Sequence, residues 1–142
     1  MSSNTKVDLS TLDEFVRHYI TAARWSSVDD EGTSLDDPEF DVAADTEATM
    51  RADCRSWISA NADLLSELSA VAEECGYGSH PDCGTIAPVA AACAHDLWLA
   101  RNGHGSGFWD RNLGELGERL ATAAGKAGMR DLYVSGGMIC QG

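Results

Sequence analysis

The sequence predicts a mainly α-helical fold, a compact bundle of about four to five helices with a small C-terminal β-hairpin (a minor α+β element). In several segments, apolar residues recur at the 3.6-residue spacing of an amphipathic helix. Near the C-terminus, two short runs of β-forming residues flank the pair Gly136-Gly137, which is typical of a two-residue hairpin turn. With 142 residues the chain fits a single domain. We therefore expect one domain over residues 1–142, with residues 1–9 flexible.

The first helix is predicted from residue 12 to residue 25. Ser10 or Thr11 is suited to cap it, and Glu14 follows Thr11 at the spacing of a capping box. Trp25 ends the apolar stripe, and a loop is expected over residues 26–44. The stripe itself comprises Leu12, Phe15, Val16, Tyr19, Ile20 and Ala23.

A second helical pattern starts near Asp45 or Thr46 and continues to about Ala72. Asn61 and Asp63 are suited to cap a new helix, so this pattern can also be read as two helices that meet near residue 61. A loop rich in glycine, cysteine and histidine is expected over residues 76–84.

A third helix is predicted between residues 86 and 100, with Pro88 in its first turn and Gly103 just beyond its end. A fourth is predicted between residues 113 and 127, weakened by its glycines. The hairpin should combine residues 132–134 with residues 138–140, and it must pack on the helices or pair with another strand to be stable.

The charge is strongly unbalanced, with 23 acids against 10 bases and a formal net charge of −13. Such a chain repels phosphate backbones, so direct binding of nucleic acid is not expected. Nine of the acids lie between residues 29 and 47, where no base occurs. Solubility and Ca²⁺ binding are alternative explanations, but the alternating pattern of a calcium loop is absent. We call residues 26–44 the acidic loop, and its candidate partner-binding residues are Asp29, Asp30, Glu31, Asp36, Asp37, Glu39 and Asp41.

A dense cluster of special residues lies between residues 96 and 111. His104 is a candidate general base or metal ligand, oriented by Asp96 or Asp110. The structural alternative makes Gly103-His104-Gly105 a helix-ending turn. In that case Trp98, Phe108 and Trp109 would fill the core, while Arg101 and Arg111 would pair with Asp96 and Asp110. We favour the structural interpretation, because no second catalytic residue stands at a known spacing from His104.

This cluster reads DLWLARNGHGSGFWDR, and WSSVDD precedes it at residues 25–30 while DLYV follows at residues 131–134. These segments resemble a family of small proteins encoded by bacteriophages and prophages, with an NGHGxGFWDR core motif. The resemblance covers most of residues 12–139, and the chain is longer than the family pattern between about residues 69 and 92. It implies a phage-borne origin and expression in a bacterial cytoplasm. It carries no catalytic role, because no activity is established for that family.

Cys75, His80 and Cys83 are weak candidate metal ligands with the spacing C-x4-H-x2-C, and Cys93 and His95 follow. A tetrahedral zinc site is one interpretation, although closely paired ligands are missing. A Cys75–Cys83 disulfide is a second. Partly buried free thiols are the interpretation we favour, with no bound cofactor.

Together these observations favour a phage-encoded acidic accessory protein that binds a host or phage protein with a basic surface and inhibits it, as an anti-defence protein that mimics nucleic acid would. One alternative is a small hydrolase centred on His104 with Asp96 or Asp110. Another is a virion or assembly accessory protein. No membrane span or signal peptide is expected, so we expect the chain in the cytoplasm of the bacterial host.

Overall fold

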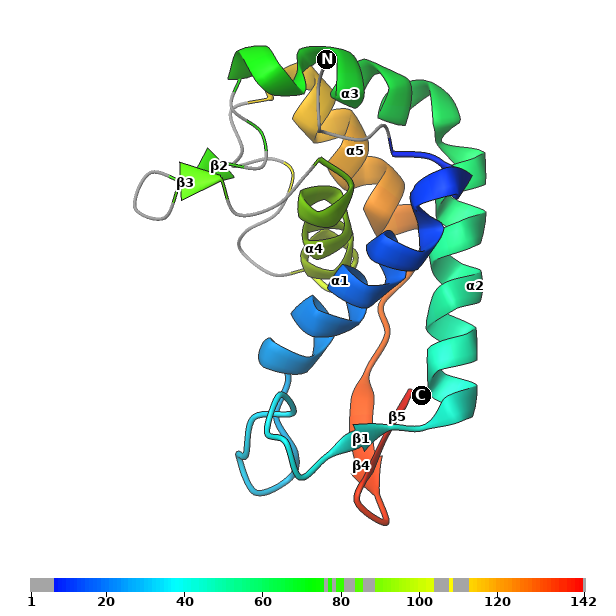
Figure 1. The fold of residues 1–142 in the computed structure, drawn as a ribbon, viewed down its shortest axis with the longest axis vertical. Coiled ribbons are helices and arrows are strands. Elements are labelled where there is room, and N and C mark those ends of the chain that lie inside the picture. Colours follow the sequence, from blue (N-terminus) through cyan, green and yellow to red (C-terminus); the bar gives the residue numbers. More distant parts are fainter. Residues whose placement is uncertain are drawn as a thin grey trace.

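The computed structural model is mainly helical and carries a small sheet at one end, as the sequence predicts (Figure 1). It describes residues 7–75, 77, 79–80, 84–85, 89–103, 108 and 113–141. Five α-helices and two small sheets lie within this part of the chain. No helix of the described residues is long and apolar enough to span a membrane.

Helix α1 spans Leu12–Trp25, in agreement with the predicted range, but it starts differently. A short 3-10 helix, Leu9–Thr11, precedes it, and Asp8 caps that turn by accepting the Ser10 N–H at 2.9 Å. The hydroxyl of Thr11 accepts the Asp8 N–H at 3.3 Å, so Thr11 makes no side-chain cap to α1. The predicted capping box of Thr11 and Glu14 is therefore wrong, because the extra turn occupies the Thr11 hydroxyl.

The long second pattern is two helices, α2 at Ala44–Ala60 and α3 at Ala62–Cys75. Asn61 separates them with a non-helical backbone, and its side-chain amide donates to the Trp57 carbonyl at 2.9 Å. This confirms the two-helix interpretation. Because α2 begins at Ala44, the acidic loop ends in the structure at Ala43.

Helix α4, Val89–Arg101, is the centre of the molecule, and every described side chain on it except His95 is buried. It packs against α1 and against α5, Glu115–Lys126 (Figure 1). An apolar stripe alone would bury one face of a helix, whereas α4 is apolar on nearly all sides. The large side chains buried in this core include Trp98 of α4 itself and, from other segments, Phe15, Tyr19, Met50, Leu65, Leu68, Phe108 and Leu120.

The predicted hairpin is confirmed as β4, Leu132–Ser135, and β5, Met138–Gln141. Gly136 and Gly137 both have positive φ, 60° and 79°, as the tight turn between them requires. A third strand, β1 at Asp41–Val42, pairs in parallel with β5, so the strand order is β1-β5-β4.

The acidic loop thus contains a regular element, which the sequence did not predict. Strand β1 has only two residues, too few to show an alternating pattern. It is held by backbone bonds from Asp41 to Gly137 at 3.4 Å and from Ala43 to Ile139 at 3.0 Å. A small antiparallel pair, β2 at Ser79–His80 and β3 at Gly84–Thr85, lies in the segment predicted as a loop over residues 76–84 and extends one residue beyond it.

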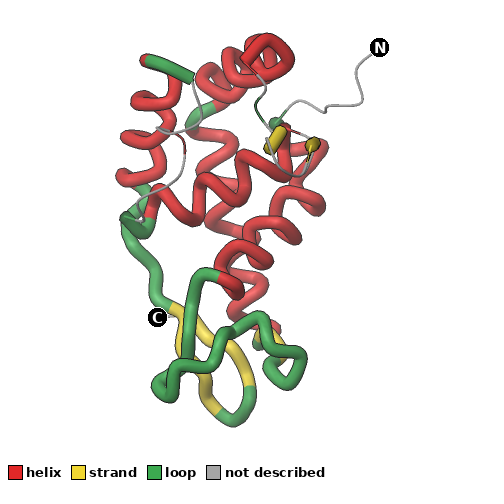
Figure 2. Tube along the Cα trace, turned by 90° about the vertical axis from the view of Figure 1, so that its left-hand side faces the viewer, coloured by secondary structure: helices red, strands yellow, loops and turns green. Residues whose placement is uncertain are grey.

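A second, smaller core lies between the acidic loop and the three-stranded sheet. Leu35, Phe40 and Ile139 form its buried centre, and Val42, Leu132 and Val134 pack around them. The loop and sheet together form the end of the molecule remote from α3 (Figures 1 and 2).

Candidate functional site

The backbone of the acidic loop is fixed to the end of α1 by one arginine. The Arg24 guanidinium donates to the carbonyls of Leu35 at 2.9 Å, Asp37 at 3.3 Å and Phe40 at 2.8 Å. Arg24 lies in the last turn of α1, so the loop folds back against the helix from which it leaves. Its cation is directed to backbone carbonyls and pairs with no carboxylate of the described residues.

Two buried apolar side chains anchor the loop to the sheet. Leu35 is fully buried and Phe40 nearly so, both against Ile139 of β5. In the part of the loop that follows α1, the chain turns back on itself, and an isolated antiparallel β-bridge joins Val28 to Ser34. Burying a leucine and a phenylalanine contributes on the order of 2 kcal/mol each. The loop is therefore part of the folded structure.

Three of its carboxylates stabilise the loop itself. Asp29 Oδ1 accepts the backbone N–H groups of Glu31 at 2.9 Å and Thr33 at 2.8 Å. Asp37 Oδ1 accepts the Glu39 N–H at 2.9 Å. Asp36 Oδ1 accepts the Ser34 hydroxyl at 2.8 Å. These acids form the turns that hold the loop backbone, a common role of aspartate in turns.

Four other carboxylates of the acidic loop are exposed and accept no hydrogen bond from the described residues: Asp30, Glu31, Glu39 and Asp41. The ion pairs of the described residues lie elsewhere. They join Arg51 to Asp13, Arg119 to Glu67, and Arg101 and Arg130 to Asp53. The negative charge predicted to cluster here is thus presented on an ordered surface, and none of these four carboxylates forms an ion pair with the described residues.

The predicted catalytic cluster is described only in part. Asp96 is buried, 2% exposed, and accepts the Tyr77 hydroxyl at 2.6 Å. His104 and Asp110 lie outside the described residues. Trp98 and Phe108 fill the core as the structural interpretation predicts, and the Trp98 indole donates to the Ser26 hydroxyl at 2.8 Å. Trp109 and Arg111 also lie outside the described residues.

Arg101 does not pair with Asp96, so that part of the prediction is wrong. Its buried guanidinium contacts Asp53 of α2 at 3.2 Å and donates to the Tyr19 hydroxyl of α1 at 2.9 Å. It also donates to the carbonyls of Gly128 and Ala127, both at 2.6 Å.

Burial raises the pKa of the Tyr19 phenol far above its ordinary value, and the Arg101 charge opposes this only in part. Arg101 thus ties α1, α2 and α4 to the segment after α5. Asp53 lies 48 residues before Arg101 in the sequence, so sequence spacing could not predict the ion pair between them.

The candidate metal ligands are not tested by the described residues. Cys83 and the side chains of Cys75 and His80 lie outside them. Cys93 is fully buried in α4, and burial raises the pKa of its thiol well above the ordinary value. The His95 ring lies 5.8 Å from that of His18. In the part of the chain that the structure describes, no group of three or more histidine, cysteine or acidic side chains could hold a metal ion.

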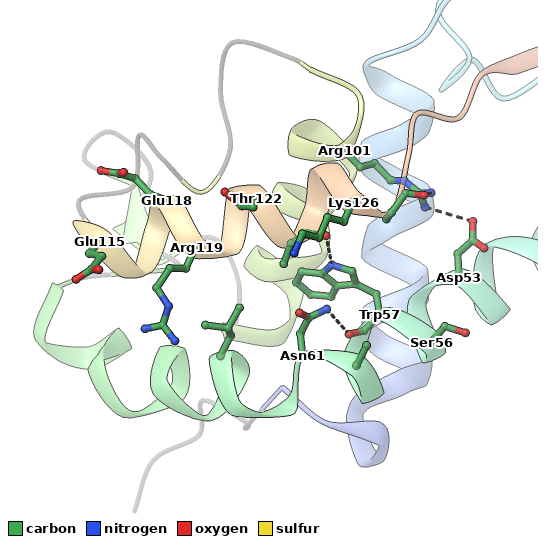
Figure 3. Close-up of a pocket in the computed structure, with 14 residues that line it drawn as sticks. Asp53, Ser56, Trp57, Asn61, Arg101, Glu115, Glu118, Arg119, Thr122 and Lys126 are labelled. Atoms are coloured by element: carbon green, nitrogen blue, oxygen red, sulfur yellow. Dashed lines mark hydrogen bonds and ion pairs between the residues drawn. The ribbon is translucent and has the colours of Figure 1, made fainter.

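A groove of about 740 Å³ lies between α5 and the junction of α2 with α3 (Figure 3). Trp57 forms part of its lining, where the indole donates to the Ala123 carbonyl at 3.2 Å and stacks on Phe108. Arg101 and Asp53 lie at one end of the groove, and Glu115 and Glu118 at the other (Figure 3). Its charges are mixed in sign, and nothing in the sequence predicted it.

Comparisons of this chain with protein families, with curated proteins and with solved structures found no match.

Proposed function

We propose that this protein is a binding protein that uses its acidic loop to occupy a basic surface on a partner protein. The observation that supports this most strongly is the set of four exposed carboxylates on a packed loop that contains no base. Solubility requires only net charge, so it gives no reason to place like charges side by side on an ordered segment. Repulsion between them costs stability, and a partner's cations would relieve that cost.

Electrostatics suits this loop to fast and salt-sensitive association. An exposed patch of one sign steers an oppositely charged partner toward it, and its effect extends over roughly 10 Å at 0.1 M salt. Because the loop is already folded, binding does not have to fix its backbone, which would otherwise cost about 1–2 kcal/mol per residue.

The partner chemistry that fits best is a protein surface that ordinarily binds nucleic acid. Such surfaces present lysine and arginine side chains to a row of phosphates. A row of carboxylates can occupy the same cations, which would make the chain an inhibitor of anti-defence type. The resemblance to phage-encoded proteins supports a bacterial host protein as the target, with a phage protein as the alternative partner.

A pull-down from bacterial lysate at low and high salt tests this proposal. The bait is the wild-type protein beside a loop-neutralised variant that leaves the hydrogen-bonded acids intact: Asp30→Asn, Glu31→Gln, Glu39→Gln and Asp41→Asn. We expect a partner that wild type retains at low salt, loses at high salt, and that the variant fails to retain.

The control removes the same number of charges from exposed acids on α3 and α5 that form no ion pair with the described residues: Asp63→Asn, Glu74→Gln, Glu115→Gln and Glu118→Gln. This body-neutralised variant should retain the partner. Equal retention by all three proteins would contradict the proposal, as would the absence of any salt-sensitive partner.

A further inference from the structure

Strand β4 forms an unpaired edge of the three-stranded sheet. Of the described strands, only β5 pairs with it, since the order is β1-β5-β4. The Ile139 carbonyl of β5 accepts a hydrogen bond from the Ala43 N–H, so it points toward β1. Its partner across the hairpin, Val134, is therefore in a non-hydrogen-bonded pair, because such pairs alternate along an antiparallel ladder. The backbone N–H and C=O of Val134, and by the same alternation those of Leu132, point away from the sheet.

Apart from its short length of four residues, this edge lacks the features that usually block strand addition. Strand β4 reads Leu-Tyr-Val-Ser, with no lysine, proline or bulge. Leu132 and Val134 direct their side chains into the small core under the acidic loop, so the strand is held in place. Tyr133 is 50% exposed on the opposite face. Because one face of β4 is packed and its outer backbone groups are unpaired among the described strands, the strand is a template to which a further strand can add.

The free edge and the acidic loop belong to one surface. Leu35 and Phe40 of the loop pack in the same small core as Leu132 and Val134. Asp36, Asp37 and Glu39 are their immediate neighbours in the chain. A strand added beside β4 would therefore carry every second side chain on the face of the sheet that the acidic loop covers, where carboxylates favour basic residues.

We propose that β4 receives an extended, lysine- or arginine-rich segment of the partner as an additional strand of the sheet. This rests on the proposed function and names the form in which the basic partner binds. Backbone hydrogen bonds to Leu132 and Val134 supply the register, and the loop carboxylates select basic side chains. A second copy of this chain does not fit, because its own acidic loop, which contains no base, would approach the same surface.

The test uses a capped seven-residue peptide with lysine at alternate positions and valine or threonine between them. Two further peptides of equal charge carry N-methyl groups on the backbone. In one peptide the backbone nitrogens of the lysines are methylated, and in the other those of the intervening residues. In an extended strand these two sets of N–H groups face opposite edges, so only one set can bond to β4. We expect one methylated peptide to bind at least about tenfold more weakly than the parent, the effect of losing one or two net hydrogen bonds.

Two readouts on the protein accompany the titration. The Val134 amide should exchange with solvent more slowly when the parent peptide is bound. Val134→Pro removes an N–H that no ladder bond uses, and it should weaken the parent peptide about tenfold. The methylated peptides keep the test decisive even where this proline disturbs folding.

Two results would overturn strand addition. Equal binding by all three peptides is one, and absence of binding by the parent is the other. A third outcome separates the two proposals. If both methylated peptides bind as the parent does, and the loop-neutralised variant binds none of them, strand addition is contradicted while the proposed function stands. Failure of the proposed function is read separately, from the pull-down.

Discussion

Arg101 holds together a buried polar cluster that joins α1, α2 and α4 to the segment after α5. Its guanidinium joins Asp53, Tyr19 and two backbone carbonyls, and it is only 4% exposed. Removing one member of a fully buried ion pair costs about 3–5 kcal/mol, and because Asp53 is 20% exposed this pair belongs at the lower end of that range. Arg130, 3.4 Å from Asp53, compensates in part.

We therefore expect Arg101→Met to lower the free energy of unfolding by about 3 kcal/mol. The control is Arg119→Met, whose side chain is 48% exposed in its pair with Glu67 and should cost under about 1 kcal/mol. Urea denaturation of the two variants measures both values. Equal losses would show that Arg101 is not a structural centre.

His18 is predicted to make stability depend on pH. Burial chiefly, and then the Arg17 charge, hold the His18 pKa below its ordinary value of 6.5, while Glu14 opposes them. Well above pH 6.5 the imidazole is neutral in both the folded and the unfolded chain, so it does not affect the free energy of unfolding. As the pH falls below 6.5, the unfolded chain takes up the proton first, so folding stability is lost.

Urea denaturation between pH 7.5 and pH 5 measures this effect. His18→Gln should lose less stability over that range than wild type does. The same pH slope in both proteins would contradict the assignment.

At the scale of elements, two glycines of α5 have opposite roles. A Cβ at Gly117 would lie 2.7 Å from the Phe108 carbonyl oxygen, whereas one at Gly125 would meet nothing within 4 Å. Gly117 thus permits the backbone near Phe108 to approach the helix, and Gly125 only lowers helix propensity.

We expect Gly117→Ala to destabilise the protein by about 1–3 kcal/mol, the usual cost of overpacking. Gly125→Ala should stabilise it by up to about 1 kcal/mol. Thermal unfolding of the two variants compares them directly. A stabilising Gly117→Ala would contradict the close approach.

The elements that the sequence predicted are those with a long repeating signal. Periodicity placed all five helices, and Asn61 marked the break between α2 and α3. Periodicity could not predict β1, because this strand has only two residues and pairs with a strand almost a hundred residues later in the sequence. Nor could it find the Arg101–Asp53 pair or the groove at Trp57, because each depends on packing between helices far apart in the sequence.

For the whole molecule, the sequence located the negative charge but could not show that it lies on an ordered surface. Leu35, Phe40 and Arg24 make that difference. Only the folded structure shows what these residues contact: β5 for Leu35 and Phe40, and three backbone carbonyls for Arg24.

If the exposed acids serve binding, removing them should not weaken the fold. The loop-neutralised variant should unfold at the same or a higher temperature than wild type, since repulsion between neighbouring carboxylates falls. Added salt should raise the melting temperature of wild type more than that of the variant. A clear loss of stability would instead assign these carboxylates a structural role.

The most direct test of the acidic loop is the affinity of a purified captured partner for the loop-neutralised and body-neutralised variants, measured side by side. The two variants carry the same net charge and differ only in where the charge was removed. We predict that the loop-neutralised variant binds at least about tenfold more weakly at low salt, equivalent to about 1.4 kcal/mol, while the body-neutralised variant binds as wild type does. Equal affinities for the two variants would mean that net charge alone attracts the partner, and would contradict the assignment of binding to this loop.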